Sequence, residues 1–423
     1  MEMPSTSIRS LLRGNILVLT VSRIIWSLSS AIVMPYLSLY ILNLGGNKPI
    51  IGLVNALGNL AGIFLYPIGG YIADKAGRAR LVGFSTLLYA SSFLFFALAP
   101  DWRWVAAGLI YQQLALFYMP ALNAIMADSI PVGVRGRILS LMIAIPGAVR
   151  IIAPYIGGLL IAVYTLRPAM RIGYLISFAL GVLVAAMRLR YLQETIEGEG
   201  MGRDVLGIFK AAYTEIAGSL RWIGAHMRGY TALAIILIFV NSVVMPFWVV
   251  YATEVIGLTP YQWGVILLIG GVVRTVTSLI AGSLVDRMGA KTCMLIAFAV
   301  AAPSMILFTL SRGFLEASLV YVALSLAGVF LWIATSVLLA DTIPRAIRGR
   351  VMAALGQGVG IGIAGGGYAS GFLLFIPMTL GSFISGYIYQ INPAYPWLIQ
   401  SITLTAVLIL AVWLVKEPER AEA

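Results

Sequence analysis

The chain has 423 residues, of which 61% are hydrophobic and only 10% are charged. Soluble domains are about 45–50% apolar and about 25% charged, so this composition excludes an ordinary soluble protein and indicates an integral membrane protein. The formal net charge of +12 would suggest nucleic acid in a soluble protein, but here the charge follows membrane topology, and we expect no nucleic-acid partner.

Long apolar runs predict membrane-spanning helices, because each run has about 20 residues or more. Twelve spans are predicted, six in each half of an all-α membrane protein. Their approximate ranges are 16–43, 51–73, 81–100, 104–127, 137–164, 171–190, 232–256, 261–285, 291–311, 315–340, 351–390 and 396–415. We therefore predict a first bundle at 1–190, a cytoplasmic linker at 191–230 and a second bundle at 231–423.

The first apolar run, 16–44, follows Arg9 and Arg13 and is too long for the core of a cleavable signal peptide. We read it as a retained helix whose N-terminus is inside. Twenty Lys and Arg residues then lie in cytoplasmic segments and five lie outside. The positive-inside rule therefore predicts a multi-pass protein of the plasma membrane with both termini cytoplasmic, and the basic inner surface favours anionic lipid.

Cysteine and histidine are too scarce to build a redox or metal centre. Cys293 is the one cysteine, so no internal disulfide is possible, and the one histidine, His226, lies in the polar linker. The sequence also has no nucleophile–base constellation and no phosphate-binding loop. We expect no metal, no cofactor and no enzymatic activity.

The linker contains an amphipathic pattern with apolar residues three and four apart. These residues are Leu206, Phe209, Tyr213, Ile216, Leu220 and Ile223. The pattern predicts a helix that either lies on the membrane surface or docks on the cytoplasmic face of the bundle.

Three blocks recur in the same order in both halves, and each block lies about half the length of the chain from its copy. They are Met34-Pro35-Tyr36 with Met245-Pro246-Phe247, the polar stretch from Gly70 to Arg80 with Gly282 to Lys291, and Ala127 to Arg137 with Ala340 to Arg350. A duplicated six-helix unit is the simplest explanation.

On these motifs the chain resembles the major facilitator superfamily over essentially its whole length. The pattern Gly70, Asp74, Gly77, Arg78 between the second and third spans is similar to the family's most diagnostic signature. The resemblance implies two pseudo-symmetric six-helix bundles with substrate bound near the midplane between them. It also implies that Asp74 and Arg78 form a cytoplasmic latch with Asp128.

The second copy of the signature is weaker, because Ala290 stands where Arg78 would fall. Its candidate gating residues are Gly282, Asp286, Arg287 and Asp341. The alternative to the latch is that Lys75, Arg78 and Arg80 only satisfy the topology rule.

Three arginines lie inside predicted spans: Arg23, Arg150 and Arg274. A rise of about 1.5 Å per residue places Arg150 about 20 Å and Arg274 about 18 Å from the cytoplasmic ends of their spans, near the midplane. No carboxylate is predicted at that depth, so an anionic substrate is the simplest counter-charge, and Arg suits carboxylate or phosphate. The alternative is hydrogen bonding to helix carbonyls and polar side chains such as Asn241.

The candidate substrate-contacting residues are thus Arg23, Arg150, Arg274, Asn241 and Trp332. Coupling to protons has one candidate in the outer half, Glu254, whose position beside Gly257 also fits a solvated helix end. Around Pro154 the fifth span partly resembles the signature of drug–proton antiporters, but Ala153 replaces the expected glycine.

The eleventh span is rich in glycine between Gly356 and Gly371. Two alignments with the fifth span compete: Gly158 with Gly371, or Ala153 with Gly381, which requires about 15 inserted residues. We favour the second, because about 40 apolar residues exceed one span. The helix is then expected to unwind near Gly365 to Gly367, unless the glycines only permit close packing.

The leading functional hypothesis is a monomeric secondary transporter that works by alternating access on a small anionic solute, with proton coupling or exchange. The first alternative is a proton-coupled exporter of drugs or metabolites, with an aromatic lining that includes Trp332. The second, from another class, is a membrane sensor or lipid scramblase on the same scaffold.

Overall fold

The structure, a computed structural model, describes residues 13–65, 77–131, 135–195, 218, 220–344, 347–356, 358–361 and 371–415. Most of these residues are helical and none of them forms a strand, which confirms the all-α prediction. The helices are α2 (Gly14–Val33), α3 (Leu37–Asn43), α4 (Lys48–Leu65), α6 (Arg78–Ala97), α7 (Trp102–Ala115), α8 (Met119–Ser129), α9 (Arg135–Tyr164), α10 (Leu166–Tyr191), α12 (Arg228–Val244), α13 (Trp248–Glu254), α14 (Pro260–Met288), α15 (Ala290–Leu310), α16 (Phe314–Thr342), α17 (Arg348–Leu355), α18 (Phe375–Ile391) and α19 (Tyr395–Leu414).

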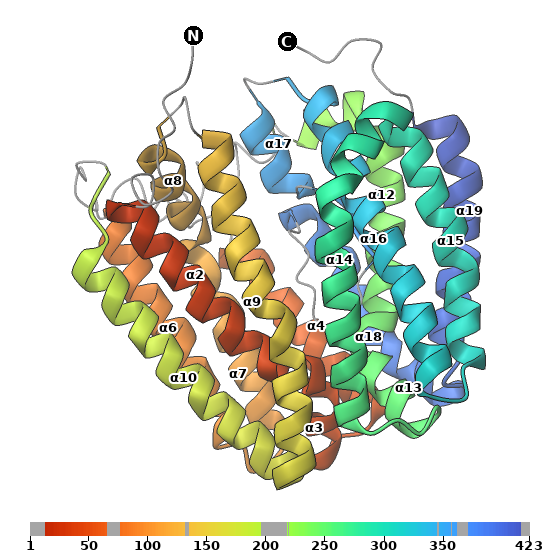
Figure 1. Cartoon of the computed structure of the whole chain (residues 1–423), viewed down its shortest axis with the longest axis horizontal. Coiled ribbons are helices and arrows are strands. Elements are labelled where there is room, and N and C mark those ends of the chain that lie inside the picture. Colours follow the sequence, from red (N-terminus) through yellow and green to blue (C-terminus); the bar gives the residue numbers. More distant parts are fainter. Residues whose placement is uncertain are drawn as a thin grey trace.

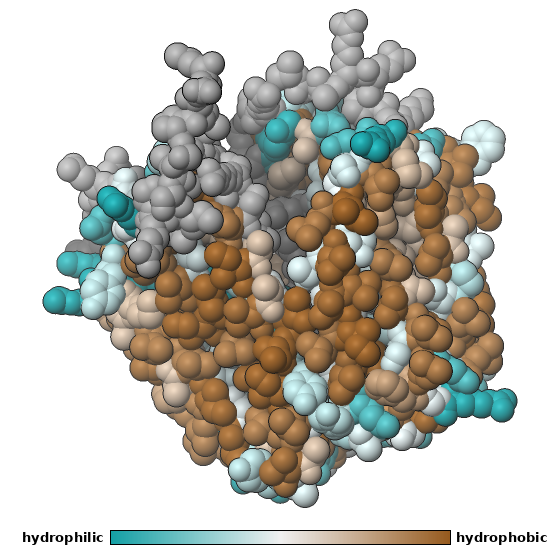
Figure 2. Space-filling view, in the orientation of Figure 1, coloured by the Kyte–Doolittle hydropathy of each residue, from teal (hydrophilic) through white to brown (hydrophobic). Residues whose placement is uncertain are grey.

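Within the described residues, ten helical segments are long and apolar enough to cross a membrane. Of the other two predicted spans, 51–73 is described as far as Leu65, and 351–390 is interrupted. The middle of the face shown in Figure 2 is mostly hydrophobic, and hydrophilic residues gather toward its two ends. This distribution is that of a multi-pass membrane protein, because side chains that face the lipid tails are not in contact with water.

The repeated Met-Pro blocks have the same local structure in both halves. The 3₁₀ turns η1 (Met34–Tyr36) and η4 (Met245–Phe247) interrupt the first and seventh predicted spans, separating α2 from α3 and α12 from α13. Proline causes both interruptions because it lacks a backbone N–H and crowds the preceding turn. The two signature loops also match, since Gly77 and Gly289 both begin a helix with φ near 85°, which favours glycine.

The two halves lie side by side in Figure 1 and converge at the end that carries α3 and α13. Two glycines allow this convergence. A Cβ atom on Gly158 of α9 would lie 2.8 Å from the Pro260 carbonyl oxygen, and one on Gly386 of α18 would lie 2.2 Å from that of Lys48. Toward the opposite end, where α8 and α17 lie, the halves diverge.

These two crossings decide between the alignments of the eleventh span. Gly158 meets the start of α14, and Gly386 meets the start of α4, so they are equivalent positions in the two halves. More residues separate Gly158 from Gly386 than separate Pro35 from Pro246 in the repeated blocks. The difference is about the length of the proposed insertion. The structure therefore supports the alignment that contains the insertion.

The insertion lies in a broken helix. α17 ends at Leu355, Gly356 has φ 84°, and residues 358–361 are not helical. The break thus begins before the glycines at 365–367, which lie outside the described residues. The next helix among the described residues, α18, begins at Phe375 after the turn η5 (Phe372–Leu374).

The described end of the linker is docked on the bundle. Residues 220–226 are helical, and the side chains of Ile223 and Met227 are buried in the hydrophobic core. The rest of the amphipathic pattern, from Leu206 to Ile216, lies outside the described residues.

Candidate functional site

A cavity of about 220 Å³ lies between the two halves. It is lined by residues of α2 and η1 and of α9 from the first half, and by residues of α14 from the second. Most of the lining is apolar and includes Met34, Ile151 and Leu267, while Ser30 and Thr275 supply hydroxyl groups. The cavity is therefore an amphipathic chamber that both halves must build together.

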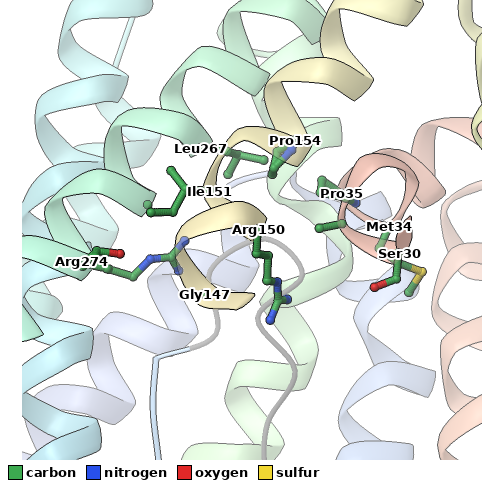
Figure 3. Close-up of a pocket in the computed structure, with 12 residues that line it drawn as sticks. Ser30, Met34, Pro35, Gly147, Arg150, Ile151, Pro154, Leu267 and Arg274 are labelled. Carbon is green, nitrogen blue, oxygen red and sulfur yellow. The ribbon is translucent and has the colours of Figure 1, made fainter. Parts of the chain in front are cut away.

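The two deepest arginines predicted from the sequence, Arg150 on α9 and Arg274 on α14, both line this cavity. The Arg274 side chain reaches toward the helix that carries Arg150 (Figure 3). The two guanidinium groups are close enough to repel each other. Arg274 makes no hydrogen bond or ion pair with any residue that the structure describes. The cavity thus concentrates positive charge contributed by both halves.

Two glycines shape the chamber around these arginines. A Cβ atom on Gly147, one turn before Arg150, would meet no atom within 4 Å, so this position opens into the cavity. A Cβ atom on Gly271 would lie 2.9 Å from Ile151, so here α14 and α9 are in contact. No aspartate or glutamate is among the described lining residues. The described lining therefore carries two positive charges and no described negative charge.

The other predicted substrate residues are not in the cavity lining. Asn241 of α12 donates from Nδ2 to the Gly360 carbonyl oxygen at 2.7 Å, and its Oδ1 accepts from Gln400 Nε2 at 2.7 Å. Trp332 packs beside Gly360, where a Cβ atom would lie 3.6 Å from its ring. Both residues therefore contact the broken helix. The sequence patterns predicted the break but did not indicate these two contacts.

Thr335 of α16 provides a third anchor that the sequence did not single out. Its Oγ1 accepts a hydrogen bond from the Val359 backbone N–H at 3.0 Å, while its own hydrogen has the Leu331 carbonyl oxygen of the same helix as its nearest acceptor at 2.8 Å. The bond from Val359 satisfies a backbone donor that unwinding has released from the helix, where an unpaired group is costly. Arg23 also lies away from the cavity, beside Arg188 of α10.

In the N-terminal signature, Arg78 Nη1 lies 2.6 Å from Asp128 Oδ2. This pair joins α6 to α8 within one half, while Gly70 and Asp74 lie outside the described residues. Glu194, which the sequence reasoning missed, accepts a hydrogen bond from the Ala79 backbone N–H at 2.9 Å. Its carboxylate thus caps the positive end of α6 and ties the signature loop to the segment after α10.

The second copy is arranged differently. Asp286 and Arg287 are exposed at the end of α14, and Asp341 is half-buried. None of these three side chains forms an ion pair within the described part of the chain. Arg348 instead donates to the carbonyl oxygens of Ala340 and Ile343 at the end of α16.

Gly282 of the same copy has open space around it, because a Cβ atom there would meet nothing within 4 Å. Lys291 donates to the Val412 carbonyl oxygen at 2.7 Å, and so holds α15 against α19. Among its described residues, this copy of the signature forms no Arg–Asp pair like that of the first.

Glu254, the candidate proton carrier, forms an ion pair with Lys48. The pair connects the end of α13 to the start of α4 and so joins the two halves where they converge. The Lys48 ammonium also lies 5.8 Å from the centre of the Tyr389 ring of α18.

Two helical bundles with a shared cavity between them define a membrane transporter built from two related halves. The profile of the Major Facilitator Superfamily matches residues 19–364 and 230–423, and the chain belongs to this family.

Two curated relatives show partial similarity. The Na(+), Li(+), K(+)/H(+) antiporter of Planococcus maritimus is 28% identical over 174 residues, which are 40% of this chain and 39% of that protein. The quinolone resistance protein NorA of Staphylococcus aureus (strain Mu50 / ATCC 700699) is 27% identical over 163 residues, which are 38% of this chain and 41% of that protein. The chain thus spans about two-fifths of the length of these relatives.

The crystal structure of the nucleoside transporter NupG is similar over nearly the full length. It has a TM-score of 0.69 and 16% sequence identity, and the match covers 95% of this chain and 98% of that chain. At this identity the similarity shows the fold.

Proposed function

We propose that this chain is a secondary active transporter that carries a small anionic solute by alternating access. The observation that carries the proposal is the position of Arg150 and Arg274, which enter one cavity from opposite halves. Their mutual repulsion favours a ligand with negative charge, and guanidinium groups bind carboxylate or phosphate with two parallel hydrogen bonds. A cavity of about 220 Å³ offers room for a small molecule.

The arrangement of the halves supports alternating access. With the predicted topology, the end that carries α3 and α13 is the outer end, so the arrangement corresponds to an inward-facing state with the outer side closed. We further propose that the pair of Arg78 and Asp128 takes part in the cytoplasmic gate of the opposite state. We also propose that the protein lies in the plasma membrane as a monomer, with both termini in the cytoplasm.

An exporter of drugs or metabolites is the second candidate. Its support is the apolar share of the lining, with Met34, Ile151 and Leu267, together with the partial similarity to a protein named for quinolone resistance. A sensor or scramblase would use the same scaffold without moving a solute.

The test is counterflow in proteoliposomes that contain the purified protein, with small carboxylates, phosphate esters and cationic amphiphiles as candidate solutes. We expect an anion to exchange in the wild type, and Arg150→Gln and Arg274→Gln each to reduce that exchange at least tenfold. The exposed Arg312→Gln is the matched control and should transport normally. Counterflow of cationic amphiphiles alone would favour the exporter, and no counterflow with any solute would favour the sensor.

Coupling to protons is tested with an imposed pH gradient. If Glu254 carries the proton, Glu254→Gln should lose gradient-driven uptake and retain counterflow. If Glu254→Gln still accumulates solute under the gradient, the coupling residue lies elsewhere or the transporter is an exchanger.

A further inference from the structure

Helices α2, α6 and α10 meet inside the N-terminal half, away from the central cavity. The ring of Trp26 on α2 lies 4.8 Å from the ring of Tyr89 on α6. A Cβ atom on Gly181 of α10 would lie 3.5 Å from Trp26. The face of α2 that carries Trp26 is therefore directed at both neighbouring helices.

Polar side chains gather at this junction beside Trp26. Ser22 and Arg23 lie four and three residues before Trp26, on the same face of α2. Thr86 lies three residues before Tyr89, and Arg188 lies two turns beyond Gly181. Arg188 Nη1 donates a hydrogen bond to Thr86 Oγ1 at 2.7 Å, which places its guanidinium at the junction.

Two donors at this junction have no hydrogen-bond partner among the described residues. Arg188 is 3% exposed, and its Nε is buried without a hydrogen-bond partner among the described residues. The Ser22 hydroxyl is also buried and unpaired within that part of the chain. Arg23 forms no ion pair with a described residue, and it is close enough to Arg188 for the two charges to repel.

The described carboxylates of this half are engaged elsewhere. Asp101 caps α7, Asp128 pairs with Arg78, and Glu194 caps α6. A guanidinium without a carboxylate partner inside a helix bundle is unfavourable, because burial removes the water that would solvate its charge. Two of them at one junction require a counter-charge that these carboxylates do not supply.

We propose that a small inorganic anion of the size of chloride binds between Arg23, Arg188 and Ser22 as a structural counter-ion of the N-terminal half. The close packing favours a single-atom anion, since Ser22 and Thr86 are both 0% exposed. The anion would accept hydrogen bonds from Arg188 Nε, the Arg23 guanidinium and the Ser22 hydroxyl. It would thereby tie α2, which also lines the central cavity, to α6 and α10.

The experiment measures the thermal unfolding midpoint of the purified full-length protein in an uncharged detergent. Sodium chloride is compared with sodium gluconate at equal ionic strength, so that general screening is the same in both. An anion that binds only the folded state raises the midpoint as its concentration rises. The variants are Arg188→Gln, Ser22→Ala, the double variant Arg150→Gln/Arg274→Gln, and Arg190→Gln as the matched control, because Arg190 is exposed on the same helix.

We expect chloride to raise the midpoint of the wild type, of Arg190→Gln and of the central double variant. The increase should disappear in Arg188→Gln and shrink in Ser22→Ala, which keeps the proposal testable if the arginine variant does not fold. The proposal is overturned if the wild type does not respond to chloride, or if both junction variants respond fully. It is also overturned if the response is lost in the central double variant and retained in Arg188→Gln.

A lipid phosphate is the other possible source of negative charge. Three results together would assign the junction to a lipid headgroup instead of an inorganic anion. Phosphatidylglycerol stabilises the wild type in gluconate, chloride does not stabilise it, and the lipid effect is lost in Arg188→Gln. Because the central double variant is measured in parallel, failure of this proposal and failure of the transport proposal give different results.

Discussion

Lys48 of α4 and Glu254 of α13 form an ion pair across the two halves of the protein. The two other ion pairs between described residues, Arg78 with Asp128 and Arg103 with Asp101, each lie within the first half. The Lys48 and Glu254 side chains are 23% and 42% exposed, so solvent screens their attraction. Pairs of this kind contribute about 0.2–1 kcal/mol.

Breaking this pair should therefore shift the balance between the two states without abolishing transport. We expect Lys48→Glu to favour the outward-open state by up to about fivefold, because like charges would face each other where the halves converge. Distances between spin labels on α3 and α13 report the change. The swap Lys48→Glu/Glu254→Lys should restore the wild-type distribution, and a swap that behaves like the single variant would contradict a direct interaction.

A larger side chain at the glycine crossing should prevent outer closure more strongly. A Cβ atom on Gly386 would lie 2.2 Å from the Lys48 carbonyl oxygen, and a backbone atom cannot move aside cheaply. We expect Gly386→Val to destabilise the closed outer end by about 1–3 kcal/mol. The same labels should show separated halves in this variant. Gly313→Ala is the control, because a Cβ atom there meets nothing within 4 Å, and a wild-type distribution in Gly386→Val would refute the role of this crossing.

Filling the cavity should block binding without disturbing the fold. Gly147 faces open space, so Gly147→Leu places its side chain among the lining residues without a backbone clash. We expect anion exchange to fall more than tenfold while the unfolding midpoint changes little. Counterflow and thermal unfolding of the same preparation check both parts, and normal exchange in this variant would place the solute elsewhere.

The Arg78–Asp128 pair should act on transport through its charge. Asp128→Asn leaves Arg78 without its described carboxylate partner, and we expect slower exchange. The swap Arg78→Asp/Asp128→Arg should recover part of the rate. Exchange at the wild-type rate in Asp128→Asn would show that these residues only satisfy the topology rule.

The broken helix should depend on its side-chain anchors. Thr335→Val keeps the shape of the side chain but leaves the buried Val359 N–H without its acceptor. We expect a loss of about 1–3 kcal/mol of stability, seen as a lower unfolding midpoint. Thr405→Val is the matched control, because the Thr405 hydroxyl bonds only within its own helix. Equal midpoints for the two variants would argue against the anchor.

The sequence alone determined features that depend on local chemistry or on distance along a helix. The interruptions at Pro35 and Pro246 and the turns at Gly77 and Gly289 recur because proline and glycine act through their own backbone. Counting residues also placed Arg150 and Arg274 at a common depth, since the rise per residue along an α-helix is constant.

The tertiary structure alone decided which way each side chain faces and which distant residue it meets. Arg23 interacts electrostatically with Arg188 of α10 and is not among the residues that line the cavity, and Asn241 holds the unwound segment at Gly360. Glu254 meets Lys48, 206 residues away. Residue spacing fixes the faces of a helix relative to one another, but the rotation of that helix against its neighbours is set by packing. That Arg150 and Arg274 lie at matching positions along their helices could therefore be predicted from the sequence, whereas the partner of each charge could not.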